Sequence, residues 1–369
     1  MMNLLRLQSR RLKWLPINMS VRNLVSWEPM GEPLPGYTVV LACMKRLAPL
    51  AAANLRLCAR QDCPRMSEMI LVFDCPVGDV PAGVLDAVRE VAPSIKVRLV
   101  GYGERQDEVA RRFNWGWVYS WLSWSLAIGQ TRTRAMIIHD LDAMPIYPGL
   151  FERLYDNWLE EGAEFCGICP YQRNFVTKEM ALVATYEMTL DAAYLREKFR
   201  PFDLLNKFRL VDGRLVNFDT LLNPQWLSPR RSRAERPIDE TWLVHPSLVI
   251  GNYIDLVSRR KNFLGVDHSL PVLPYFLYLG GDGDSLAAAG PQLAVPWARS
   301  VTVFGHEMGI DGIVPEHWAW MEKQIRRLEQ ALFGETRPEV KDYLRGFISR
   351  AGEHRTVGVE TGATAVADR

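Results

Sequence analysis

The stretch RTRAMIIHDLDAMPIYPG, residues 132–149, passes abruptly from an apolar run to two aspartates. The run at 135–138 is short, ends in β-branched residues and is followed by helix-breaking prolines, so it predicts a buried strand that ends in a loop. Asp140 and Asp142 then lie at the carboxyl end of that strand, where ligands bind in open α/β sheets. Alternate residues of an extended chain point to the same side. The pair therefore predicts a site for Mg²⁺ or Mn²⁺, which prefer oxygen ligands.

Strand and helix patterns alternate along the chain before this stretch. Strands are expected over 37–44, 67–74 and 95–103, and helices over 50–61, 80–92 and 114–130. Such alternation predicts parallel strands with helices on both faces of the sheet. An isolated pair of aspartates would fit a solvated surface turn, but at a strand end of this sheet the pair favours a ligand site.

The last of these helices carries an aromatic stripe. Trp117, Trp121, Trp124 and Ile128 are spaced by four, three and four residues, which puts them on one helix face. A sugar-stacking platform or a membrane-facing surface would use such a face too. Because the helix lies between two strands of the sheet, we expect the stripe to pack in the core.

The second half of the chain is less regular. A helix over 150–161, a strand over 164–169 and helices near 185–199 and 316–335 are expected, and the last helix should pack on the body of the protein. Residues 223–237 read as a long basic loop, typical of mobile binding segments. Its arginines would either meet a diphosphate or an acidic acceptor, or remain solvated. They are Arg230, Arg231, Arg233 and Arg236.

The composition is that of an ordinary globular protein. Of 369 residues, 48% are hydrophobic and 24% charged, and 44 basic residues against 43 acidic ones leave a net charge of +1. Wholesale disorder and a nucleic-acid partner drawn by a global field are therefore excluded. The sequence contains neither a signal peptide nor a run of about 18 apolar residues that would span a membrane, so we expect a cytoplasmic protein.

The N-terminus permits at most a peripheral contact with the inner membrane face. Leucines and a tryptophan alternate there with basic residues, which is compatible with attachment to a membrane surface. A frayed terminus accounts for the same residues, and we favour it. The residues are Leu4, Leu5, Leu12 and Trp14, with Arg6, Arg10, Arg11 and Lys13.

The six cysteines include one close pair, CGIC at 166–169. The pair lacks the second half of a zinc site and ends a strand instead of opening a helix, so neither zinc nor redox chemistry is favoured. We expect buried, reduced thiols, as in a reducing cytoplasm.

Three features in order resemble one protein family. A first strand and helix lead to VFDCPVGD, residues 72–79, and a further strand and helix lead to MIIHDLDAMP, residues 136–145. Over roughly residues 37–170 this arrangement resembles the GT-A glycosyltransferases, particularly the family-two-like members, whose second strand ends in a pattern like VVDDGSxD and whose later strand ends in a DxD motif. Asp74 and Asp79 take the outer acidic positions of the first pattern, and Cys75 replaces the inner one.

The resemblance implies an α/β fold of GT-A type, with a mixed, Rossmann-like central sheet, helices on both faces, and a C-terminal acceptor-binding and helical region. It implies transfer of a sugar from a nucleotide-sugar donor to a carbohydrate or lipid-linked acceptor. The corresponding segments are an N-terminal extension (1–35), a nucleotide-sugar-binding half (36–170), an acceptor-binding half (171–315), C-terminal helices (316–350) and a disordered tail (351–369).

The resemblance also implies roles for individual residues. Ala42, Met44, Asp74 and Asp79 would contact the nucleotide of the donor. Asp142, together with Asp140, would hold Mn²⁺ or Mg²⁺ on its diphosphate. A cation there stabilises the charge that develops on the leaving nucleoside diphosphate.

Some members of the family add a histidine to the metal ligands. His268 is our first choice for this ligand and His245 the second, although a lone histidine is more often structural. His139, which directly precedes the two aspartates, could orient their loop.

Inverting members of the family use a carboxylate to deprotonate the acceptor hydroxyl. We prefer Asp239 or Glu240 of IDETW for this base because they directly follow the basic loop. The alternative interpretation of these two residues is an acid-rich helix N-terminus. Asp282 and Asp284 of GGDGD are the second choice.

Two other classes of protein remain open. A haloacid-dehalogenase-like phosphatase could use DLD as nucleophile and acid and GGDGD as its metal loop, but Met144 and Leu286 stand where its motifs want other residues. A protein with the GT-A fold that binds a sugar or a partner without catalysis would carry the same sheet. The retained DLD argues mildly against this class.

Overall fold

The computed structural model describes residues 2–246, 249–258, 269–295, 297–303 and 305–360. The chain divides into two compact units. The first comprises Met1–Leu141 and Tyr147–Leu243, and the second comprises Asp142–Ile146 and Val244–Arg369. The five segments expected from the sequence remain a prediction.

A seven-stranded sheet forms the centre of the first unit, in the order β10-β6-β7-β4-β1-β2-β3. Strands β3, β2, β1 and β4 are parallel, β7 pairs antiparallel with both β4 and β6, and β6 pairs parallel with β10. The sheet is therefore mixed, as predicted. The strands are β1 (Leu34–Cys43), β2 (Met66–Phe73), β3 (Val97–Gly101), β4 (Thr133–His139), β6 (Phe165–Gly167), β7 (Met188–Asp191) and β10 (Arg233–Glu235).

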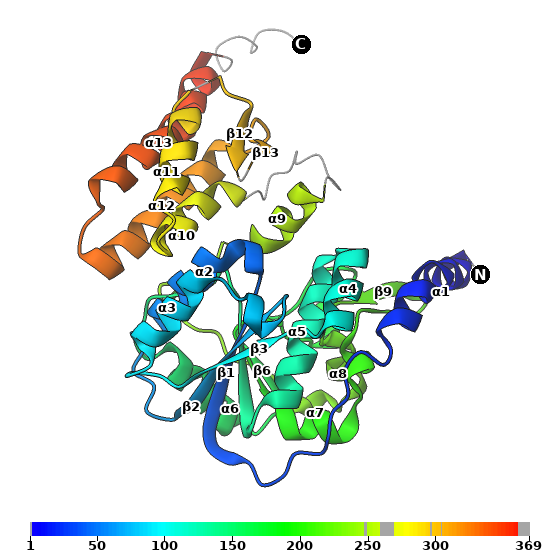
Figure 1. The fold of residues 1–369 in the computed structure, drawn as a ribbon. Coiled ribbons are helices and arrows are strands. Elements are labelled where there is room, and N and C mark those ends of the chain that lie inside the picture. The colour runs from blue at the N-terminus through cyan, green and yellow to red at the C-terminus, as the bar shows by residue number, and fades with distance from the viewer. Residues whose placement is uncertain (1, 247–248, 259–268, 296, 304, 361–369) are drawn as a thin grey trace. The chain divides into compact units, whose positions relative to one another are not determined.

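Helices cover both faces of this sheet, which confirms the predicted α/β class. In Figure 1, α2 and α3 lie on one side of the strands, and α5 and α7 lie on the other. Alternation along the strands explains this, because Val40, Ile70 and Ile138 point to the face on which α5 packs. The helices are α1 (Met2–Val21), α2 (Ala48–Ala59), α3 (Ala82–Val91), α4 (Glu104–Phe113), α5 (Gly116–Gln130), α6 (Leu150–Glu161), α7 (Ala192–Lys198) and α8 (Leu222–Leu227).

The aromatic stripe of α5 packs in the core, as predicted. Trp121 is fully buried, and its indole Nε1–H donates to the Pro201 carbonyl at 2.7 Å. Trp124 and Ile128 are buried with it. Trp117, at the start of the stripe, is partly buried and stacks on Trp14 of α1 with 4.5 Å between ring centroids.

The N-terminus is not frayed, and our preference for fraying was wrong. Helix α1 spans Met2–Val21 and packs by Leu7, Ile17 and Val21, all buried. The sequence did not reveal this packing because the three buried positions are widely spaced and four basic residues lie among or beside them.

Two segments of the second half differ from their predictions. The helix expected near 185–199 is strand β7 followed by the shorter helix α7. The basic loop at 223–237 contains α8 and the edge strand β10, so it is not irregular throughout. A strand of three or four residues is too short to show a pattern of alternating apolar and polar residues in the sequence. Such strands form because they pair with a neighbouring strand. A hairpin of β8 (Lys207–Val211) and β9 (Arg214–Phe218) lies between α7 and α8 in sequence.

The second unit is mainly helical. The expected helix at 316–335 is α12, which buries Trp318, Met321, Ile325 and Leu328 and packs against α13, so that face is covered within the protein. Helix α13 includes residues 351–360, the first part of the tail that we expected to be disordered. The elements are β5 (Met144–Pro145), β11 (Leu243–Val244), α9 (Val249–Val257), α10 (Leu273–Leu279), α11 (Asp284–Leu293), β12 (Ser300–Val303), β13 (His306–Gly309), α12 (Pro315–Phe333) and α13 (Pro338–Glu360).

All six cysteines are free thiols. Four are buried, whereas Cys63 and Cys169 are partly exposed, so the prediction of buried thiols is confirmed for most of them. Among the residues that the structure describes, no helix combines the length and the apolar character needed to cross a membrane.

Candidate metal centre

The parallel strands β4, β1 and β2 end at the same edge of the sheet. In the parallel register, Leu41 of β1 pairs with His139 of β4, and Cys43 of β1 pairs with Phe73 of β2. Asp74 and Asp140 therefore follow β2 and β4, the two strands that flank β1, at one edge of the sheet. This carboxyl edge is the ligand-binding edge of open α/β sheets.

Asp140, Asp142 and His245 come together after β4. Each offers one ligand atom, and these atoms all lie within 4.8 Å of one another. His245 Nε2 is 3.5 Å from Asp142 Oδ1, and the Ile250 backbone N–H donates to Asp142 Oδ2 at 3.4 Å. His245, the second choice from the sequence, thus joins the two aspartates. His268, the first choice, lies outside the described residues.

Asp142 is buried and yet is held in its charged form. Burial by itself raises its pKa, but hydrogen bonding to His245, the charge of that imidazole and the Ile250 N–H together bring the pKa below the usual value of an aspartate. A buried, ionised carboxylate needs a positive partner. Two carboxylates and an imidazole fit Mn²⁺ or a similar divalent ion, because each of these donors is a common ligand for such metals.

A buried polar network holds the turn that carries the aspartates. His139 Nδ1 lies 2.6 Å from Glu187 Oε1, and His139 Nε2 lies 2.9 Å from Asn54 Oδ1. The Asn54 amide in turn donates to the backbone carbonyls of Asp140 at 3.3 Å and Leu141 at 3.1 Å. The side chains of His139, Asn54 and Glu187 are fully buried. The structure thus gives His139 the position expected of a residue that orients the loop.

Sequence reasoning missed Asn54 and Glu187. Asn54 had one signal, since it is a polar residue inside an alanine- and leucine-rich helix that the sheet was expected to bury. An amide at such a position has to find hydrogen-bond partners. Glu187 lies just before β7, a strand that the sequence did not predict, so nothing indicated its neighbour.

The residues expected at the nucleotide lie around the loop after β1. The Lys45 backbone N–H donates to Asp74 Oδ1 at 2.6 Å, and Lys45 Nζ lies 3.6 Å from Asp79 Oδ2. Ala42, near the end of β1, and Met44, directly after the strand, are partly exposed. Burial raises the pKa of Asp74, against the hydrogen bond from Lys45. The two aspartates are therefore tied to the β1–α2 loop, and their contact with a nucleotide stays a prediction.

The residues preferred as the catalytic base lie in an exposed turn. Asp239 and Glu240 are exposed, and the Thr241 N–H donates to Asp239 Oδ1 at 2.7 Å. They do not begin a helix, so the alternative of a helix N-terminus is wrong. Of the arginines before them, Arg233 donates to the Met180 carbonyl at 3.1 Å, and Arg236 pairs with Glu161.

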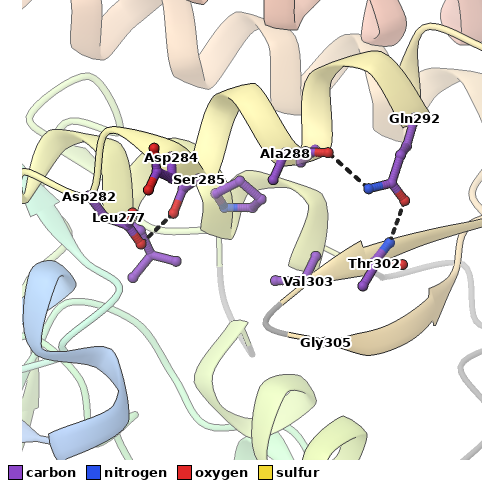
Figure 2. Close-up of a pocket in the computed structure, with 11 residues that line it drawn as sticks. Leu277, Asp282, Asp284, Ser285, Ala288, Gln292, Thr302, Val303 and Gly305 are labelled. Carbon is purple, nitrogen blue, oxygen red and sulfur yellow. Dashed lines mark hydrogen bonds between the residues drawn. The ribbon is translucent and has the colours of Figure 1, made fainter.

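The second-choice base residues line a separate cavity of about 290 Å³ in the second unit. Asp284 begins α11 and Asp282 lies just before that helix, and both line the cavity together with residues of the β12–β13 hairpin (Figure 2). Asp282 Oδ2 accepts from Ser285 Oγ at 2.6 Å. Neither aspartate belongs to the group of Asp140, Asp142 and His245. A phosphatase would need DLD and GGDGD at one metal, so the described residues do not favour that class.

Comparison with solved structures finds distant similarity over most of the chain. The S. aureus TarS fragment 1–349 is 12% identical, with 87% of this chain and 92% of that one covered and a TM-score of 0.37. The mannosyltransferase PcManGT from Pyrobaculum calidifontis, in complex with GDP-Man and Mn²⁺, is 14% identical, with 92% of each chain covered and a TM-score of 0.36. Glucosyl-3-phosphoglycerate synthase from Mycobacterium tuberculosis, with Mn²⁺ and UDP, is 12% identical, with 72% and 83% covered and a TM-score of 0.37.

No protein-family model matches the chain, and no curated protein matches it. At TM-scores below 0.4 the solved structures support no inference about the reaction of this chain. The features that the resemblance implies are nevertheless present in this structure, namely the mixed sheet and the Asp-x-Asp group at its carboxyl edge.

Proposed function

We propose that this protein is a metal-dependent glycosyltransferase that moves a sugar from a nucleotide-sugar donor to a carbohydrate or lipid-linked acceptor. The observation that carries the proposal is the Asp140–Asp142–His245 group at the carboxyl end of β4. A surface turn with two solvated aspartates would leave Asp142 exposed, whereas here it is buried beside an imidazole. The network behind the turn adds to the argument, because a solvated turn needs no buried support.

The residues of this site take the following roles in the proposal. Asp140, Asp142 and His245 hold a divalent ion, Mn²⁺ or Mg²⁺. When bound, such an ion supplies positive charge that stabilises a nucleoside diphosphate as its bond to the sugar breaks. Asp74 binds the nucleoside from the end of β2, which is separated from β4 by β1 and ends at the same edge of the sheet.

A base is needed to take the proton of the acceptor hydroxyl. We propose Asp239 or Glu240 for this step, because both are exposed in a turn and accessible to an acceptor. A carboxylate there would accept the proton as the hydroxyl oxygen attacks the sugar carbon. The localisation that we propose is cytoplasmic.

The first test measures ligand binding by thermal unfolding. The native protein is heated with a panel of nucleoside diphosphates that includes UDP and GDP, with and without Mn²⁺. A ligand that binds only the folded state raises the melting temperature by mass action. We expect a Mn²⁺-dependent rise with one nucleotide, and its loss in Asp142→Asn, which keeps the size of the side chain.

Asp86→Asn is the matched control, because Asp86 is an exposed aspartate of α3 that pairs with Arg89. This variant should keep the full rise. No rise with any nucleotide, or an equal rise in Asp142→Asn, would contradict the proposed donor site. Hydrolysis of p-nitrophenyl phosphate that disappears in Asp142→Asn would favour the phosphatase instead.

A further inference from the structure

Helix α1 presents a row of large apolar side chains to solvent. At about 100° per residue, these side chains fall within an arc of about 100° on the helix. Leu12 and Met19 have exposed fractions of 70% and 72%, values usual for polar residues. Exposed apolar side chains gathered on one face of a helix are typical of interaction sites. The row, which we call the α1 face, consists of Leu4, Leu5, Leu12, Leu15 and Met19.

The opposite side of α1 is anchored, so the direction of the α1 face is set by the fold. Leu7, Ile17 and Val21 are buried in the first unit. Trp14 stacks on Trp117 with an interplanar angle of 3° and meets Phe208 edge-on at 4.8 Å between centroids. A helix that could rotate would bury its leucines, whereas this packing keeps the α1 face outward.

The charge of α1 points to the partner. The helix contains no aspartate or glutamate, and its basic residues are Arg6, Arg10, Arg11 and Lys13. Arg6 and Lys13 are exposed. A helix with an apolar face and only positive charges matches an anionic lipid surface, where long basic side chains reach the headgroups while leucines enter the acyl boundary.

A groove continues the α1 face at the C-terminal end of the helix. Its volume is about 860 Å³, within the range of lipid- or drug-sized sites. Arg22 and Arg200 are exposed at it, and its two acids are engaged, since Asp203 accepts from the Arg200 N–H at 3.0 Å and Glu197 pairs with Lys198 at 2.7 Å. The apolar lining includes Leu15, Met19, Phe199 and Phe202.

We infer that α1 and this groove form a docking surface for anionic phospholipid membranes. The α1 face enters the bilayer surface, and Arg22 and Arg200 at the groove contact the phosphates. This inference does not rest on the proposed sugar transfer, because membrane binding can be measured without donor or acceptor.

The test is sedimentation with vesicles. The full chain is mixed with vesicles of phosphatidylcholine, or of phosphatidylcholine and phosphatidylglycerol in equal parts. We expect binding to the mixed vesicles that weakens as salt is added. The triple variant Leu12→Gln/Leu15→Gln/Met19→Gln should bind more than about 100-fold more weakly, because each buried side chain of this size contributes about tenfold. Glutamine favours helix, so α1 should remain intact.

A second variant tests the charges separately. Arg22→Gln/Arg200→Gln should weaken binding to the mixed vesicles about 30-fold, since each basic residue near an anionic surface contributes about fivefold. The control Arg60→Gln/Lys96→Gln removes two exposed cations elsewhere and should change binding little. Leu159→Gln, at an exposed leucine of α6, is the control for the triple variant.

Three results would overturn the inference. The first is equal binding to both kinds of vesicle, and the second is unchanged binding in the triple variant. The third is a protein that doubles its mass in lipid-free solution and returns to a monomer in the triple variant, which would make a second copy of the chain the occupant of the α1 face. Circular dichroism of each variant checks that the helices are intact.

Discussion

Replacing Asn54 by alanine should both destabilise the protein and loosen the metal centre. The Asn54 side chain makes three hydrogen bonds with the end of β4 and the turn after it, to His139 Nε2 and to the carbonyls of Asp140 and Leu141. Asn54 is fully buried, so water cannot replace these hydrogen bonds when the side chain is removed. A buried hydrogen bond contributes about 1 kcal/mol, and an orphaned partner costs at least as much. We therefore expect the free energy of unfolding to fall by about 3 kcal/mol.

The two readouts are urea denaturation and Mn²⁺ titration by calorimetry. Partners behind the ligands of a metal typically change its affinity by about 10–100-fold. We expect that loss in Asn54→Ala because the turn that carries Asp140 and Asp142 loses its support. The control is Asn157→Ala in α6: Asn157 is also buried, but its Oδ1 has no hydrogen-bond partner among the described residues. This variant should leave the Mn²⁺ affinity unchanged.

The reasoning fails if Asn54→Ala loses less than about 1 kcal/mol of stability. It also fails if Asn54→Ala binds Mn²⁺ as tightly as the native protein. A stability loss without a change in Mn²⁺ affinity would leave the network as a purely structural feature. In that case the position of Asp142 would depend on His245 and Ile250 alone.

Two further predictions concern the first unit. Trp121→Ala should lower the free energy of unfolding by about 3–5 kcal/mol in denaturant, as other large core truncations do. The control Trp297→Ala, at an 83% exposed residue, should lower it by less than about 0.5 kcal/mol. An equal loss in the two variants would place Trp121 outside the core. Burial lowers the pKa of Lys207 to about 8, so between about pH 8 and pH 10 the unfolded chain keeps a proton that the folded chain has lost, and stability rises with pH. In Lys207→Met this contribution should be absent, and a pH-independent difference between the two proteins would show a solvated lysine.

The sequence by itself determined the parallel half of the sheet and the placement of the two aspartates. Strands β1, β2 and β4 and helices α2 and α5 carry enough apolar residues at a regular period to be recognised without any partner. Parallel strands put their carboxyl ends on one edge, so the placement of Asp74 and Asp140 at the same edge of the sheet followed from the parallel arrangement alone. Local periodicity was sufficient here because each of these elements buries its own face.

Only the tertiary structure decided which residues surround the aspartates. Glu187 reaches His139 because the short strand β7 pairs antiparallel with β4, and His245 reaches Asp142 from a segment far along the chain. Likewise, Trp14 finds Trp117 and fixes the outward direction of the α1 face. Such contacts depend on which distant segment pairs with a strand edge or fills a space in the core. The periodic pattern within one segment does not contain this information, because hydrogen bonding and packing in the folded chain determine it.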